Sequence, residues 1–193
     1  MVTPGVYNGA TTGVAPVDQN LVLTGYIGPE QLSIARRCAE RLRMPFLDFA
    51  TRFEDRTATT ADALRAQYGD ARLRSIESDL MDEIALARGS VIHISGQVLL
   101  GADHYALMRA TGPVICLVAT LDAVLQRLHL ALGARYHDPK ERGLALGTLR
   151  REWAIRTLPE IVEIDTSTLS EADMIDRITE TWRALTGVID WGR

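Results

Sequence analysis

The chain has 193 residues, of which 47% are hydrophobic and 24% charged, and its formal net charge is −4. This size and composition are typical of one globular domain with a substantial core. A mildly negative charge favours neither nucleic acid nor an anionic membrane as a partner. The sequence has no apolar run of about 18 residues and no basic and apolar leader pattern, so we expect a cytoplasmic protein without a membrane partner.

The cysteine, histidine and lysine residues indicate which kinds of binding site the sequence favours. Cys38 and Cys116 lack the spacing of a metal or redox motif, which predicts buried core thiols. The four histidines fall in separate elements and form no ligand pair, so no metal site is predicted. Lys140 is the only lysine in the sequence, and arginine would have to replace lysine in most roles that bind phosphate.

The order of apolar segments predicts the fold. Residues 1–20 are rich in Gly, Pro, Thr and Asn and are expected to be a flexible extension, followed by a single domain over residues 21–193. Expected strands lie at 21–23, 45–48, 91–94, 113–118 and 161–164. Expected helices lie at 32–42, 62–67, 72–87, 104–110, 121–132, 144–157 and 170–185. This alternation predicts a three-layer α/β/α fold with a five-stranded, mostly parallel, doubly wound sheet.

Two connecting segments deserve separate expectations. Residues 133–143 are polar and contain Gly and Pro, which favours a mobile lid loop. Residues 95–97 follow a buried strand and are expected to be a loop. In the first helix, Leu32, Ala35, Ala39 and Leu42 are expected to form the apolar face.

A glycine turn with Gly25 and Gly28 joins the first strand to the first helix. In an α/β protein such a turn binds phosphate through backbone N–H groups and the positive end of the helix. The phosphate-loop pattern G-x-x-x-x-G-K-[ST], started at Gly25, requires Gly, Lys and Ser or Thr at its last three positions. Those positions hold Glu30, Gln31 and Leu32, and Ser33 lies one residue late.

These replacements predict a degenerate loop that is filled by the protein itself. We expect the Glu30 carboxylate to occupy the first helical turn and to satisfy the N–H groups and dipole that otherwise attract phosphate. The alternative is an ordinary strand-to-helix turn that never bound nucleotide. If a nucleotide does bind, Gly25, Gly28 and Ser33 are the cofactor-binding candidates.

Four segments, in this order, resemble the shikimate kinase family, which belongs to the nucleoside-monophosphate-kinase-like P-loop proteins: ERLRMPFLDF, GDARLRSIESDL, HISGQVL and EIDTSTLSEADMIDRI. They are similar to the family's strand end with aspartate, its substrate helix, its triple-glycine turn and its closing segment. The resemblance covers roughly residues 21–185. It implies a kinase that transfers the γ-phosphoryl group of ATP, with Mg²⁺, to a hydroxyl of a small ring carboxylate beneath a lid.

The resemblance also implies roles for single residues. Asp48 matches a strand-end aspartate associated with Mg²⁺, and Arg135 lies where a lid arginine contacts phosphate, so both are catalytic candidates. Arg74, Glu77 and Gly96 are the substrate-binding candidates: they match a substrate arginine, the acid one turn later and the one glycine left of the triple-glycine turn.

The sequence departs from the family at other substrate positions. Ala50 stands in place of a second substrate aspartate, and the second substrate arginine falls on or next to Glu152, with Arg151 one residue early. Plain structural roles are the alternatives for the candidates. Arg74 then pairs with Glu77 on the helix surface, Asp48 caps the following turn, and the charges of the lid are solvated.

Three functions stay open. The favoured one is a noncatalytic pseudoenzyme that acts as a binding or regulatory module, because the loop lacks its lysine and hydroxyl. The second is an active phosphotransferase that uses Arg135, Lys140 or Arg36 with ATP and Mg²⁺, which are expected as cofactors only in this case. The third keeps the acceptor half and binds a small carboxylate or phosphate through Arg74. A protein partner and a homo-oligomer also stay open.

Overall fold

The computed structural model describes residues 18–133 and 138–187. Its centre is a sheet of five strands in the order β2-β3-β1-β4-β5. All neighbouring strands are parallel. The strands are β1 (Leu21–Gly25), β2 (Phe46–Asp48), β3 (Val91–His93), β4 (Val114–Val118) and β5 (Val162–Asp165). The predicted doubly wound parallel sheet is therefore confirmed.

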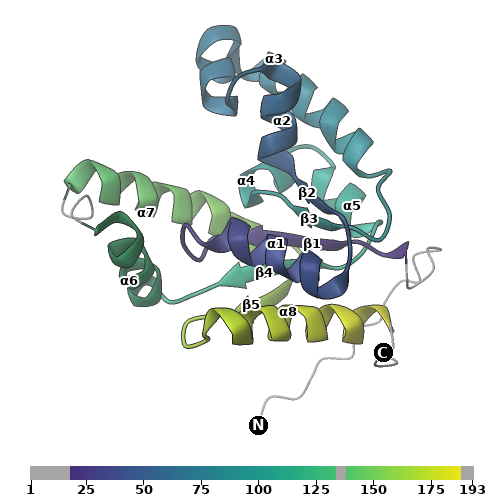
Figure 1. The fold of residues 1–193 in the computed structure, drawn as a ribbon. Coiled ribbons are helices and arrows are strands. Elements are labelled where there is room, and N and C mark those ends of the chain that lie inside the picture. Colours follow the sequence, from purple (N-terminus) through teal and green to yellow (C-terminus); the bar gives the residue numbers. More distant parts are fainter. Residues whose placement is uncertain (1–17, 134–137, 188–193) are drawn as a thin grey trace.

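Helices cover both faces of this sheet (Figure 1). They are α1 (Gln31–Leu42), α2 (Phe49–Thr57), α3 (Ala61–Ile84), α4 (Gly96–Leu99), α5 (His104–Arg109), α6 (Leu121–Leu132), α7 (Pro139–Trp153), the 3₁₀ helix η3 (Ala154–Thr157) and α8 (Glu171–Thr186). Leu21 and Leu23 belong to a core with α1, α6 and α8, whereas Val22 belongs to a second core with α2, α3 and α5. The alternation of β1 side chains between two apolar cores explains why this strand is buried along its whole length.

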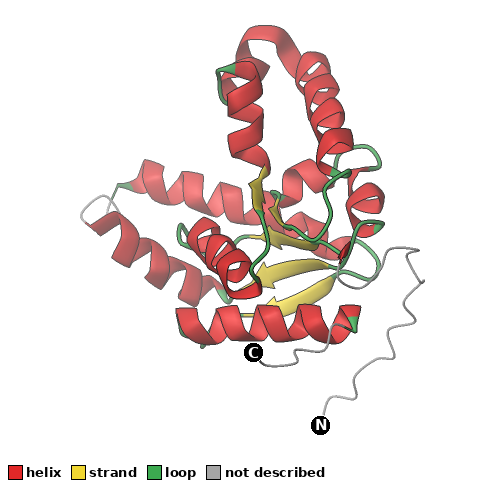
Figure 2. Ribbon diagram, turned by 45° about the vertical axis from the view of Figure 1, so that its right-hand side comes forward, coloured by secondary structure: helices red, strands yellow, loops and turns green. Residues whose placement is uncertain are grey.

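The segment after β2 differs from the expected structure. No helix was predicted between the second strand and residue 62, but residues Phe49–Thr57 form α2, and Asp48 caps it. The helices expected at 62–67 and 72–87 form the single element α3, which is kinked at Gly69 (φ 79°, ψ 171°). Only glycine adopts this conformation without strain. Figure 2 shows α2 and the first half of α3 projecting from the sheet as an arm.

The buried face of α1 differs in part from the predicted face. Leu32 is 38% exposed, whereas Gln31 is 5% exposed and lies inside with Ile34 and Cys38. Ala35 and Ala39 are buried as expected. The consequence is that a polar amide, not a leucine, enters the protein at the start of the helix.

The predicted lid and the predicted N-terminal extension also have other boundaries in the structure. Residues 134–137, and with them Arg135, lie outside the described residues, but α7 begins at Pro139, five residues before the expected helix start. Most of the extension also lies outside the described residues. Its last residue, Asn20, is fully buried and bridges the Ala87 carbonyl and the Ser90 N–H, so the fold begins before residue 21.

Cys38 and Cys116 are buried free thiols, as predicted, and burial raises the pKa of each to about 12. In the part of the chain that the structure describes, no helix has the length and apolar character needed to cross a bilayer.

Candidate functional site

The side chain of Gln31 fills the loop between β1 and α1. Its Oε1 accepts a hydrogen bond from the backbone N–H of Ile27 (3.1 Å), and its Nε2 donates to the Gly25 carbonyl (2.8 Å). A backbone N–H group of this kind is what a phosphate loop offers to an anion. The amide therefore uses one such donor and bonds the loop to its own helix.

Glu30 does not have the predicted role. It is the N-cap residue of α1, but its side chain makes no capping hydrogen bond. Its carboxylate lies instead over Gly28, where a Cβ would come within 2.5 Å of Glu30 Oε2, and pairs with Arg127 Nε at 3.4 Å. A loop filled by the protein itself is thus supported by Gln31 and not by Glu30, because Gln31 lies on the buried side of α1 and Glu30 is partly exposed.

Helices α6 and α7 hold the same loop from outside. Arg127 donates to the Ile27 carbonyl (3.2 Å) and to both oxygens of Thr166. Trp153 Nε1 donates to the Tyr26 carbonyl (3.0 Å). Burial raises the pKa of the Tyr26 hydroxyl, and the nearby carboxylates of Glu30 and Glu152 raise it further. The loop is therefore bonded to side chains of α6 and α7, and both an arginine and carboxylates lie around it.

The presence of glycine at position 25 has a structural reason that does not involve phosphate. Its φ is +94°, and a Cβ there would lie 2.2 Å from the Leu117 carbonyl of β4. Glycine is thus required for close packing of β1 against β4 at this point.

Gln31 also begins a chain of contacts that reaches β2. Its Nε2 lies 3.3 Å from His93 Nε2, and His93 Nδ1 lies 2.7 Å from Asp48 Oδ1. The other oxygen of Asp48 accepts hydrogen bonds from the backbone N–H (2.9 Å) and hydroxyl (2.8 Å) of Thr51. An ionised Asp48 only accepts, so His93 Nδ1 is the donor and its Nε2 is left to accept from Gln31.

Asp48 is ionised in this setting. Burial opposes its charge, but the hydrogen bonds from His93 and Thr51 outweigh burial, and the pKa of Asp48 is lowered. The alternative that Asp48 caps the following turn is confirmed, since its side chain accepts from Thr51 N at the start of α2. Its catalytic role stays a prediction.

Glu152 occupies the position next to Gly96. The Gly96 N–H donates to its carboxylate, and a Cβ at Gly96 would lie 2.4 Å from the Glu152 carbonyl. Ser95 to Gln97 is not the expected loop, because α4 starts at Gly96 with Ser95 as its cap. Burial raises the pKa of Glu152, and the bond from Gly96 opposes that shift. A buried acid thus lies near the position where the family resemblance places a substrate arginine.

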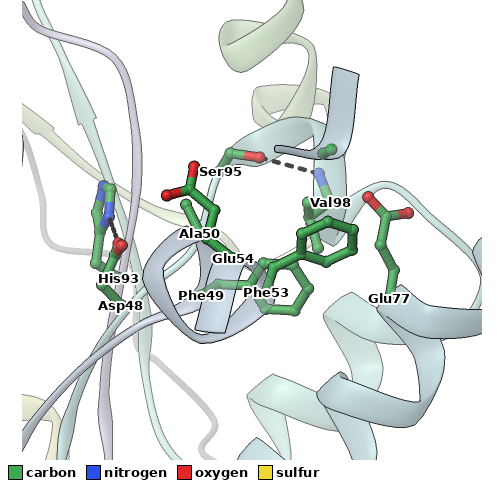
Figure 3. Close-up of a pocket in the computed structure, with 10 residues that line it drawn as sticks. Asp48, Phe49, Ala50, Phe53, Glu54, Glu77, His93, Ser95 and Val98 are labelled. Atoms are coloured by element: carbon green, nitrogen blue, oxygen red, sulfur yellow. Dashed lines mark hydrogen bonds and ion pairs between the residues drawn. The ribbon is translucent and has the colours of Figure 1, made fainter. Parts of the chain in front are cut away.

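A cavity of about 160 Å³ lies at the carboxyl ends of β2 and β3. Its lining comes from β2 and α2, α3, β3 and α4, and comprises Asp48, Phe49, Ala50, Phe53, Glu54, Ala61, Glu77, His93, Ser95 and Val98. Figure 3 shows the bonded pair of His93 and Asp48 on one side and Glu77 on the other. Ligands of open parallel sheets bind at this edge.

The structure brings together only some of the predicted site residues. Asp48 and Glu77 line the cavity, whereas Arg74 and Ser33 are exposed and Arg74 is not part of the lining. Gly96 adjoins the lining residue Ser95 but is covered by α7. Within the described residues no ion pair joins Arg74 to Glu77 within 4.0 Å, so this alternative gains no support.

Of the three substitutes considered for the loop lysine, Arg36 and Lys140 lie in the described part of the chain, and neither forms a hydrogen bond or ion pair with residues 25–31. The Arg36 guanidinium lies 5.6 Å from the ring centroid of Phe46. Lys140 is exposed at the start of α7, and Arg135 lies outside the described residues. No three histidine, cysteine, aspartate or glutamate side chains in residues 18–133 and 138–187 are grouped so that they could hold a metal ion.

Sequence reasoning missed Gln31 as the occupant of the loop, and it missed His93, Arg127 and Glu152. A signal existed for His93, because it pairs in register with Asp48 at the ends of adjacent parallel strands. No local signal marks Arg127 or Glu152, since each reaches the site from a distant helix.

The sheet order and the loop at its carboxyl edge define a doubly wound parallel α/β protein. A model of the shikimate kinase family matches residues 32–183, and the chain therefore belongs to the shikimate kinase family. The match begins directly after the residues that fill the loop.

Individual relatives agree with this assignment. A shikimate kinase from Geobacter sulfurreducens is 27% identical over 110 residues, which are 57% of this chain and 61% of that protein. The chain thus spans less than two thirds of that relative, but a shikimate kinase from Thermodesulfovibrio yellowstonii is 24% identical over 170 residues, which are 86% of this chain and 96% of that protein. The structure of shikimate kinase from Acinetobacter baumannii in complex with shikimate has a TM-score of 0.69 at 21% identity and covers 93% of this chain and 99% of its own. This similarity confirms the fold.

Proposed function

We propose that this member of the shikimate kinase family does not transfer phosphate and acts as a binding or regulatory module. One observation carries the proposal. The side chain at the lysine position of the loop, Gln31, is bonded to the loop backbone at Gly25 and Ile27. The Gln31 side chain thereby takes up one loop N–H and one loop carbonyl that would otherwise be open to a ligand.

Electrostatics support the same conclusion. Phosphoryl transfer depends on positioning and on neutralisation of charge, with little covalent chemistry from the protein. Removing one electrostatic group of this kind typically lowers a rate by about 10²–10³. This chain lacks both the loop lysine and the loop hydroxyl, and Arg127, which contacts the loop, is paired with Glu30. These residues do not fit Mg²⁺ and ATP.

The binding role rests on the cavity beside the loop. Gln31 contacts His93, and His93 is bonded to Asp48. His93 and Asp48 both line the cavity, so the cavity is linked to the loop through these contacts. A neighbour with the same fold, from Acinetobacter baumannii, was solved in complex with shikimate. A small ligand at this edge of the sheet is therefore the use of the fold that does not require the phosphate loop.

Calorimetric titration tests the proposal with ATP and a nonhydrolysable analogue, each with and without Mg²⁺. The wild-type chain should give no heat at millimolar nucleotide. A matched variant, Glu30→Gly with Gln31→Lys and Leu32→Thr, restores the phosphate-loop pattern and should bind Mg²⁺–ATP, because only side chains then distinguish the two loops.

Each outcome has a defined meaning. Mg²⁺-dependent binding and turnover by the wild-type chain would overturn the proposal and favour the rearranged phosphotransferase, for which Arg135→Ala should then abolish activity. Failure of both proteins to bind would mean that the loop backbone, as well as its side chains, excludes phosphate.

A further inference from the structure

The cavity at the ends of β2 and β3 carries charge of one sign. Three carboxylates line it, those of Asp48, Glu54 and Glu77, and no arginine or lysine of the described residues does. Asp48 is held by His93 and Thr51. A ligand carboxylate would therefore enter a field that repels it.

Glu54 and Glu77 have no hydrogen-bonding or ion-pair partner for their carboxylates in the described part of the chain. Among the described residues, the carboxylate of neither one accepts a hydrogen bond or forms an ion pair within 4.0 Å. The exposed fraction of Glu77 is intermediate, and burial raises the pKa of its carboxyl, while His104, Arg65 and Arg74 lower it only in part. Arg65 is itself paired with two aspartates, Asp62 and Asp70. Glu54 is exposed, and the half-buried Glu77 has charged neighbours but forms no ion pair within 4.0 Å in the described residues, so a cation in the cavity would stabilise its carboxylate.

The remaining lining is apolar and aromatic. Phe49 and Phe53 are almost fully buried, and in the view of Figure 3 their rings lie between Glu54 and Glu77. An aromatic ring attracts an organic cation through its quadrupole, and a carboxylate attracts it through charge. A volume of about 160 Å³ is comparable with the engineered cavity of about 150 Å³ that holds benzene.

A metal ion does not suit this lining. In the described residues no three acidic, histidine or cysteine side chains are close enough to hold one. Apolar walls and separated carboxylates instead suit a cation whose charge sits on an organic body.

We propose that this cavity binds a small organic ammonium ion of about one ring in size, with Glu54 and Glu77 as the counter-charges, and not the carboxylate predicted from Arg74. The inference rests on the proposed binding function and adds the class of ligand. The amine lies near Glu54 and Glu77, and its apolar body contacts Phe49 and Phe53.

Three probes of similar shape and different charge test the proposal by calorimetry and thermal shift: benzylammonium, benzyl alcohol and benzoate. Benzylammonium should bind with a millimolar Kd and raise Tm, and its affinity should fall as salt is added. Benzoate should bind at least about tenfold more weakly, since its charge is repelled.

Variants assign the charge to its residues. Glu77→Gln and Glu54→Gln should each weaken benzylammonium about fivefold to tenfold and leave benzyl alcohol unchanged, because only a charge is removed. Asp79→Asn is the matched control, since it removes an exposed carboxylate of the same helix that is not part of the lining. Its affinity for benzylammonium should equal that of wild type.

The results separate two failures. Tighter binding of benzoate than of benzylammonium, lost in Arg74→Ala, would overturn the ammonium ligand and keep the cavity as a binding site. No binding of any of the three probes would count against the binding function itself as well as the ammonium ligand.

Discussion

Gln31→Ala is the most direct test of a loop held by its own helix. The substitution removes the bonds to Ile27 N and Gly25 O and the contact with His93. Each bond contributes about 0.5–1.5 kcal/mol net, and a buried donor left without a partner costs about 1–3 kcal/mol. Ile27 is fully buried, so its N–H is the donor that would be left without a hydrogen-bond acceptor. Because water can enter part of the space left by the Gln31 side chain, we expect the free energy of unfolding to fall by about 2–4 kcal/mol in total.

The measurement is urea unfolding with a thermal scan beside it. For a chain of this size about 1 kcal/mol shifts Tm by roughly 3 °C, so Gln31→Ala should lower Tm by about 6–12 °C. Ser33→Ala is the matched control on the same helical turn, where the side chain is exposed, and should change stability by less than about 0.5 kcal/mol. Equal stability of the two variants would refute the role of Gln31, and with it the main support for a filled loop.

Two carboxylates should respond to pH with opposite sign, and urea unfolding between about pH 3 and 8 checks both. The pKa of Asp48 is lowered, so Asp48 stabilises the fold above its unfolded value of about 3.9, and this contribution disappears as pH falls through its folded pKa. Asp48→Asn should lose about 1–2 kcal/mol at neutral pH through weaker bonds with Thr51 and His93, and its gap to wild type should close in acid. The pKa of Glu152 is raised, so its contribution is present in acid and lost as pH rises. Glu152→Gln, which can still accept from Gly96, should exceed wild type at neutral pH, and this advantage should disappear in acid; an advantage that grows in acid would contradict the assigned burial.

The pattern of apolar segments was sufficient to predict the layers and the parallel sheet. Continuous runs such as Val114–Val118 are buried on both sides, and only a parallel sheet covered by helices requires this. Helix α2 was missed because its buried side is just Phe49 and Phe53 among mostly charged and polar residues. Two apolar residues four apart are too few to distinguish a helix from a loop.

The candidate site was only half predictable, and the two halves have different physical origins. Sequence showed which groups a phosphate loop requires and which are missing at Glu30, Gln31 and Leu32. It did not show what replaces them, because that depends on which side of α1 faces the core, and neighbouring helical positions point about 100° apart. Glu152 likewise meets Gly96 only because α7 crosses over α4, a relation that no local pattern contains.

The kink in α3 has a mechanical consequence for the cavity. Ala61 lies before Gly69 and Glu77 after it, and both line the same cavity. Two walls of the cavity therefore belong to one helix that is broken between them, and the torsions of a single glycine set how far apart those walls stand. A side chain at residue 69 meets no steric obstacle, since a Cβ there has no neighbour within 4 Å, but it would oppose φ +79°. The spacing of these two walls thus depends on backbone geometry at one position on the arm, apart from the sheet that carries Asp48 and His93.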